Sequence, residues 1–163
     1  MDFSPLFEND ESVYVEKTKH YKNLGEKIKS VEFVALRSSS KLFFVEGKCS
    51  SPKPDSDHQQ LLDDYLDPIV EKFWHSFQRY LSIKFRINVD SEGEFPSSLF
   101  AQELPNMKIV FLLVIKGHKK EWLMPILDSL HKKLIVQKKI WKIDVAVWND
   151  ETALHNKFIL PIS

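Results

Sequence analysis

The chain has little cysteine, little glycine and no long apolar run, and each shortage excludes a class of protein. Its one cysteine, Cys49, cannot form an internal disulfide, which argues against a disulfide-stabilised secreted domain and fits a reducing compartment. Its four glycines form no glycine-rich phosphate-binding loop. The longest apolar run, Ile109–Ile115, is far shorter than the ~20 residues that cross a bilayer. The first residues lack the basic start and apolar core of a secretion signal. We therefore expect a cytoplasmic protein without membrane contact.

The composition is that of a folded protein with a substantial core. Of 163 residues, 43% are hydrophobic, with twelve Phe and four Trp, and this length predicts a single domain over residues 1–163. The net charge is zero, but its distribution is uneven. From Met107 to Lys142 there are nine lysines against two acids, Glu121 and Asp128. This basic segment is either a nucleic-acid-binding surface, with DNA as the partner, or a set of solvated helix faces.

Hydrophobic periodicity predicts the order of the elements. Strand patterns cover Val13–Glu16, Val31–Leu36, Lys41–Lys48, Met107–Gly117 and Trp141–Asn149, with the fourth expected at the sheet centre. Helical spacing covers Gln59–Phe85 and Lys120–Lys139, with a kink or restart of the first helix at Asp67–Pro68 and a short last helix after Asn149. Strands joined by a short loop pair antiparallel, whereas helix-linked strands tend to be parallel. The predicted fold class is therefore α/β of the α+β type, a mixed β-sheet with an antiparallel hairpin, flanked by helices.

The hairpin places two acids opposite each other. Centred on Ser39, it pairs Leu36 with Leu42, Val34 with Phe44, and Glu32 with Glu46. Lys48 lies on the same face, because side chains two residues apart on a strand share a face. Facing carboxylates repel, and partial burial strengthens the repulsion. Either a divalent cation bridges them, for which Mg²⁺ or Mn²⁺ suits oxygen ligands, or one of them is protonated.

An acid-bearing strand, a short turn and a hydrophobic strand ending in Glu46-x-Lys48 together resemble the PD-(D/E)xK nuclease superfamily, which has the restriction-endonuclease-like fold. The resemblance covers Val31–Lys48, and the following helix and strand agree with it in order. It implies Glu32 and Glu46 as metal ligands for Mg²⁺ (or Mn²⁺), Lys48 as the catalytic lysine, and metal-dependent hydrolysis of DNA phosphodiester bonds.

The chain departs from the family pattern upstream of the hairpin. Glu32 stands where the family most often has Asp, and an additional acid is expected before it, for which Glu11, Glu16 and Glu26 are the candidates. Lys72 and Ser76, four apart on the long helix, could reach the mouth of the site, although a polar helix face is the simpler interpretation. A strand-end ion pair is the corresponding alternative for Glu46 and Lys48.

Two classes of function follow from this site. One is a Mg²⁺-dependent nuclease acting on DNA, and the other is a non-catalytic binding or accessory module of the same fold with a residual metal pocket. The histidines show no metal-ligand spacing that would favour another metal site.

Overall fold

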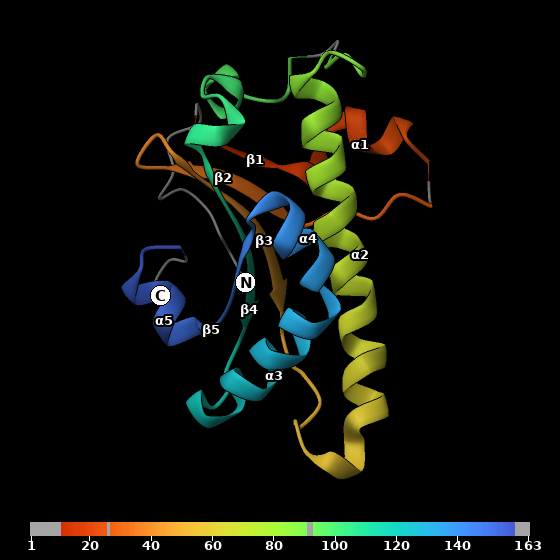
Figure 1. Ribbon diagram of the computed structural model, residues 1–163, viewed down its shortest axis with the longest axis vertical. Coiled ribbons are helices and arrows are strands. Elements are labelled where there is room, and N and C mark those ends of the chain that lie inside the picture. Colours follow the sequence, from red (N-terminus) through yellow and green to blue (C-terminus); the bar gives the residue numbers. More distant parts are fainter. Residues whose placement is uncertain (1–10, 26, 91–92, 159–163) are drawn as a thin grey trace.

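The computed structural model describes residues 11–25, 27–90 and 93–158, whose elements form one mixed β-sheet with helices on both sides (Figure 1). The strand order is β1-β2-β3-β4-β5. β1, β2 and β3 pair antiparallel, whereas β3 with β4 and β4 with β5 are parallel. This confirms the predicted fold class. The bounds are β1 Ser12–Tyr14, β2 Phe33–Arg37, β3 Lys41–Lys48, β4 Lys108–Ile115 and β5 Asp144–Asn149.

The helices form two unequal layers. Figure 1 shows α2, α3 and α4 along one side of the sheet and the short α5 on the other. No helix in the described ranges is long and apolar enough to span a membrane. The α-helices are α1 Lys19–Asn23, α2 Gln59–Lys84, α3 Lys120–Lys133, α4 Ile135–Trp141 and α5 Asp150–His155; the 3-10 helices are η1 Val15–Lys17, η2 Ser56–His58, η3 Ser97–Phe100 and η4 Leu104–Asn106.

The β2–β3 hairpin has the register that the apolar pairs predicted. Val34 pairs with Phe44 and Leu36 with Leu42. Ser38 and Ser39 turn the chain with φ values of 50° and 53°, the left-handed conformation that tight hairpin turns require. β2 begins at Phe33, so Glu32 lies one residue before the ladder, and the same register continued by one residue places it opposite Glu46.

The long helix α2 is unbroken, so of the two alternatives predicted at Asp67–Pro68, a kink or a restart, the restart is wrong. Pro68 lies inside the helix on its exposed side, where its missing N–H removes one hydrogen bond while the opposite side stays packed. That packed side meets the sheet through aromatic contacts. The Phe73 ring stacks on Phe111 at 4.9 Å, and the Phe77 ring meets Phe44 edge-on at 5.9 Å.

Two further predictions need correction. The helix expected over Lys120–Lys139 is divided at Leu134, whose φ and ψ of −102° and 14° are not helical, into α3 and α4. β4 is an interior strand, but the central strand is β3. β3 therefore carries neighbours on both edges and a helix layer over the face that contains Leu42, Phe44 and Glu46.

Candidate active site

A fully buried carboxylate lies near the end of the central strand. Glu46 follows Leu42 and Phe44 on the face of β3 that packs against α2, and its side chain is 0% exposed. It is the only buried carboxylate among the described residues. Two lysines approach the same oxygen: the Lys48 Nζ lies 2.9 Å and the Lys72 Nζ 2.8 Å from Glu46 Oε1. A buried charge is costly unless it is paired, and these two ammonium groups supply the pairing.

Lys72 reaches Glu46 from the edge of the packed side of α2. Its neighbour Phe73 and Ile69, three residues earlier, are buried, so position 72 borders the apolar stripe. The Lys72 Nζ also lies 3.0 Å from Glu16 Oε1, and its side chain is 21% exposed. Burial acts to lower the pKa of Lys72, but hydrogen bonds to Glu46 and Glu16, with their charges, outweigh it and raise this pKa above its ordinary value. Lys72 is therefore held as an ammonium group.

Of the candidate acids upstream of the hairpin, Glu11, Glu16 and Glu26, Glu16 belongs to the charged cluster around Glu46. It lies in η1, directly after β1, and reaches the site through Lys72. Glu11 lies beyond the other end of β1, where its backbone oxygen accepts a hydrogen bond from the Leu36 N–H. Glu26 falls outside the described residues. Of the two candidates that the structure describes, Glu16 is therefore the one that adjoins the site.

Glu32 lies close enough to Glu46 for their charges to interact. Burial first, and then the charges of Glu46 and Glu16, raise the pKa of Glu32 above its ordinary value, although Lys72 acts in the opposite direction. The hairpin thus brings the two predicted carboxylates together. The cluster holds three carboxylates and two ammonium groups, a net charge of −3 + 2 = −1 when Glu32 is ionised.

Two polar atoms at the site are buried without a hydrogen-bond partner within the described part of the chain. One is Glu46 Oε2, the oxygen that neither lysine contacts, and the other is the Tyr65 hydroxyl. Burial and then the charge of Glu46 raise the pKa of Tyr65, so this hydroxyl lies near the carboxylate and stays protonated. Tyr65 and Lys72 are seven residues apart on α2 and therefore share one side of the helix.

The carboxylate oxygens of the site have the chemistry that a hard cation such as Mg²⁺ prefers. No group of three or more His, Cys, Asp or Glu side chains that could hold a metal occurs in residues 11–25, 27–90 and 93–158. Mg²⁺, however, keeps several waters and is usually bound by one or two carboxylates together with substrate phosphates. Glu46 Oε2 and Glu32 are the oxygen ligands that could serve in this way.

The structure brings together Glu32, Glu46 and Lys48, and it adds residues that the sequence did not assign. The predicted ion pair of Glu46 and Lys48 exists, but the acid is buried rather than at a rim. Lys72 is a member of the site, against the preferred interpretation as a polar helix face. Ser76 is not: its hydroxyl is buried, accepts from the Val31 N–H at 2.9 Å and lies 3.3 Å from the Ser30 hydroxyl. Nothing in the sequence pointed to Tyr65.

Comparisons of the chain with protein-family models, with curated proteins and with solved structures found no match.

Proposed function

We propose that the cluster of Glu16, Glu32, Glu46, Lys48 and Lys72 hydrolyses phosphodiester bonds of DNA with the help of Mg²⁺ or Mn²⁺. The observation that carries the proposal is the state of Glu46: one oxygen is held by two lysines, while the other is buried without a partner among the described residues. A buried acid with an unused oxygen beside a second carboxylate, Glu32, suits a cation better than it suits a purely structural ion pair.

Each residue has a chemical role in this proposal. When bound, Mg²⁺ supplies charge neutralisation at the phosphate and lowers the pKa of a coordinated water. Glu46 and Glu32 provide the carboxylate oxygens that hold the ion. Lys48, 33% exposed, is the more accessible of the two lysines, and its ammonium group orients the attacking water or a phosphate oxygen. Lys72 positions Glu46 and Glu16 by contacting both.

Further lysines lie at the same end of the sheet and support DNA as the substrate. Lys116 follows β4, and its backbone N–H donates to the Lys48 carbonyl at 2.9 Å, so it adjoins the site. Lys116, Lys119 and Lys120 are all exposed. Contacts of such lysines with backbone phosphates release counterions, so binding should weaken steeply as salt rises. The lone cysteine supports a cytoplasmic location, where DNA is available to the protein.

A second candidate function is a non-catalytic binding module, and one observation favours it. Lys48 and Lys72 already compensate the charge of Glu46, so the fold does not require a cation at this place. In that case the same carboxylates and lysines would stabilise the domain, and the surrounding lysines would serve binding alone.

Cleavage of DNA by matched variants distinguishes the two functions. Linear and nicked DNA are incubated with the wild type, Lys48→Ala and Glu46→Gln, each with Mg²⁺, with Mn²⁺ and with chelator. Lys53→Ala is the control, because Lys53 is exposed and pairs with Asp55 at 3.6 Å, outside the cluster. We expect metal-dependent cleavage by the wild type and by Lys53→Ala. The cleavage rate should fall about a hundredfold or more in Lys48→Ala and in Glu46→Gln.

Three outcomes would count against the nuclease. Cleavage that survives chelator, or that Lys48→Ala retains, points to a contaminant. Absence of cleavage under every condition favours the binding module. Circular dichroism of each variant separates lost chemistry from lost folding.

A further inference from the structure

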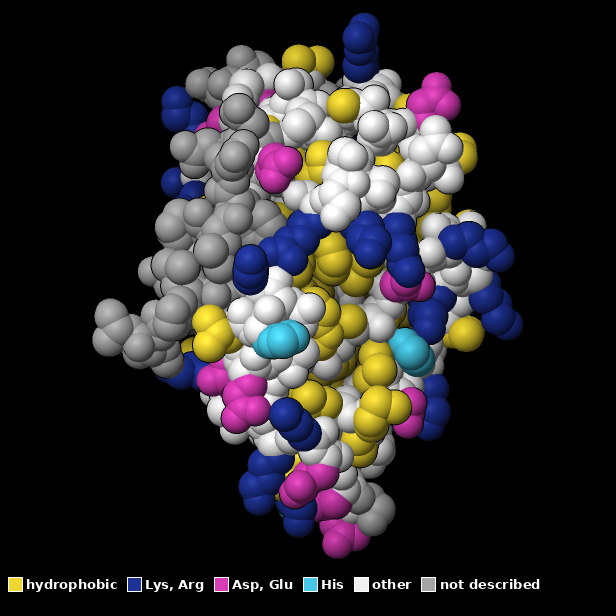
Figure 2. Space-filling model, turned by 90° about the vertical axis from the view of Figure 1, so that its left-hand side faces the viewer, with side chains coloured by type: hydrophobic (Ala, Val, Ile, Leu, Met, Phe, Trp, Pro, Cys, Tyr) yellow, Lys and Arg dark blue, Asp and Glu magenta, His cyan; other side chains and the backbone are white. Residues whose placement is uncertain are grey.

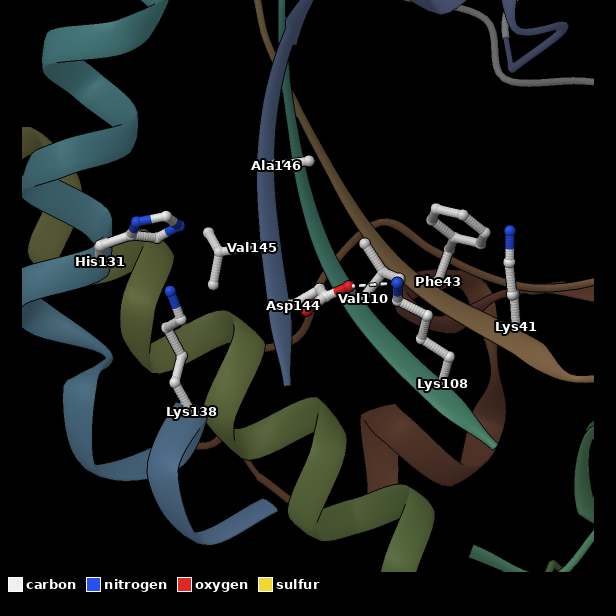
Figure 3. A pocket seen from close by; sticks show the side chains of 9 residues that line it. All are labelled: Lys41, Phe43, Lys108, Val110, His131, Lys138, Asp144, Val145 and Ala146. Atoms are coloured by element: carbon white, nitrogen blue, oxygen red, sulfur yellow. Dashed lines mark ion pairs between the residues drawn. The ribbon is translucent and has the colours of Figure 1, made fainter. Parts of the chain in front are cut away.

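A second charged site lies at the opposite end of β3, on the other face of the sheet and around its β5 edge. It is a cavity of about 330 Å³ around the starts of β4 and β5, and Figure 3 shows its lining side chains. Lys41 lies five residues before Glu46, about 16 Å along a strand, and alternation points the two side chains to opposite faces. The cavity is therefore separate from the Glu46 cluster.

The β-ladder places basic side chains side by side at this cavity. Arg37 pairs with Lys41 across β2 and β3, and Lys41 with Lys108 across β3 and β4. The Arg37 guanidinium turns towards the carbonyl oxygens of Asn156 and Lys157, at 2.7 and 2.9 Å, so Lys41 and Lys108 are the members of this row that line the cavity. Like charges on neighbouring strands destabilise a sheet unless something compensates them.

The compensation available in the protein is incomplete. Lys108 forms an ion pair with Asp144 at 2.7 Å. Lys138 reaches the cavity from α4, on the other side of β5 (Figure 3), and neither it nor Lys41 forms an ion pair within the described part of the chain. Three lysines and one aspartate leave a net charge of +3 − 1 = +2 at the cavity. Such a surplus attracts an anion with more than one negative charge.

The floor between these lysines is apolar. Phe43 and Val110 are 8% and 6% exposed, and Ala146 continues the same surface on β5. Figure 2 shows hydrophobic side chains directly below a band of Lys and Arg on this face. Cationic groups beside an apolar floor suit a ligand that has both a phosphate and a flat ring. The volume lies at the lower end of the range for small-molecule sites, which suits one nucleotide and excludes a duplex.

We propose that this cavity binds a nucleoside phosphate, with the phosphate between the neighbouring Lys41 and Lys108 and the base against Phe43 and Val110, while Lys138, across β5, adds to the positive potential. The ligand is either a free nucleotide or the terminal nucleotide of a single strand, and both present the same chemistry. The proposal does not depend on the nuclease function, because no residue of the Glu46 cluster takes part.

Calorimetric titration of the full chain with AMP, adenosine, inorganic phosphate and a 5′-phosphorylated single-stranded decanucleotide tests the proposal. We expect saturable binding of AMP below about 1 mM and weaker binding of adenosine and of phosphate. A decanucleotide that binds more tightly than AMP, with the same sensitivity to the variants below, identifies the strand end as the source. Equal affinity identifies the free nucleotide.

Variants that each replace one charged residue locate the site. Lys41→Glu and Lys138→Glu should each weaken AMP binding about tenfold or more, whereas Lys139→Glu, an exposed neighbour on α4 that does not line the cavity, should leave it unchanged. Asp144→Asn removes the one negative charge and should tighten AMP binding, a gain that misfolding cannot produce. Glu46→Gln should bind AMP like the wild type.

Three results would overturn the proposal. The first is no saturable AMP binding up to about 10 mM. The second is equal affinity for AMP and inorganic phosphate, which would mean that the apolar floor contributes nothing. The third is AMP-induced changes in amide NMR shifts at Glu46 and Lys48 rather than at Phe43, Val110 and Asp144.

Discussion

The two ends of β3 carry charged clusters that are built in opposite ways. At one end, an acid is fully buried and two lysines converge on one of its oxygens. At the other, lysines outnumber the single acid, and the Lys108–Asp144 pair has both side chains more than half exposed. In the first cluster, positive and negative charges nearly cancel, and they do so around a carboxylate that solvent does not reach. The second leaves an uncompensated positive charge in water.

This difference separates what each cluster does for the fold. Charges in a buried pair lose hydration, so each depends on its partner and removing one is costly. Charges in an exposed pair are hydrated and screened by salt, so each contributes little to stability. The buried cluster should therefore control stability and the exposed one should control binding. The predictions below test this division from the largest expected effect to the smallest.

Lys72→Met should destabilise the protein most. It removes one of the two cations on Glu46, while Lys48 stays, so we expect a loss somewhat below that of a fully broken buried pair, about 2 kcal/mol. For a chain of this size that lowers Tm by about 4–8 °C, measured by thermal circular dichroism. The control is Lys29→Met, since Lys29 pairs with Glu71 beside Lys72 on α2 but is exposed. That variant should change stability by about 0.5 kcal/mol or less. Equal losses of stability in Lys72→Met and Lys29→Met would show that Lys48 alone is enough to compensate the buried charge of Glu46.

Mn²⁺ should stabilise Lys72→Met more than the wild type. In the wild type the lysines compete with a cation for the carboxylates, whereas in the variant a cation can replace the lost positive charge. With a dissociation constant of about 1 mM, about 5 mM Mn²⁺ contributes about 1 kcal/mol, or about 2–4 °C in Tm. We expect this shift in the variant and a smaller one in the wild type. Glu46→Gln should abolish it, and an unchanged Tm in all three would favour the binding module.

The sequence predicted the members of the Glu46 cluster that come from the β2–β3 hairpin, but not Lys72, which comes from α2. The alternation of Val34, Leu36, Leu42 and Phe44 fixes a register, and that register brings Glu32 close to Glu46. Lys72 could not be assigned in this way. Hydrophobic periodicity shows which side of α2 is buried, but the rotation of the helix about its axis, which decides whether Lys72 faces Glu46, depends on tertiary packing. Its one signal was its position directly before Phe73, at the border of the buried stripe.

The basic segment shows the same limit. Its lysine surplus was visible in the sequence, but not its division between two places. Lys108 and Lys116 begin and follow the same strand, so they lie at opposite ends of the sheet. The meeting of Lys41 with Lys108 depends on the parallel register of β3 and β4, which the crossover through α2 sets. Local sequence patterns do not determine a register of this kind.

Glu32→Gln should stabilise the protein at neutral pH. The pKa of Glu32 is raised in the folded state, so ionisation of Glu32 destabilises the fold. This destabilisation is fully present above the folded pKa and disappears as pH falls towards the unfolded value near 4.3. Because Glu32 is part-exposed, we expect a gain of about 1 kcal/mol or less. Urea unfolding at pH 8, pH 6 and pH 4.5 should show the difference between variant and wild type shrinking as pH falls. A difference that grows towards low pH would contradict the raised pKa.

The Lys108–Asp144 pair should contribute least to stability, and its salt dependence separates the two clusters most directly. A double-mutant cycle with Lys108→Met and Asp144→Asn should give a coupling of about 0.5 kcal/mol, which vanishes in about 1 M NaCl because the Debye length is then only about 3 Å. The same cycle with Lys72→Met and Glu46→Gln should give a larger coupling that NaCl changes much less, since the Glu46 side chain is 0% exposed and dissolved salt screens a buried pair weakly. Equal couplings with equal salt dependence would mean that burial does not distinguish the two ends of β3. A salt-sensitive coupling would mean that Asp144 holds Lys108 only weakly. Lys108 could then exchange Asp144 for the phosphate of a ligand.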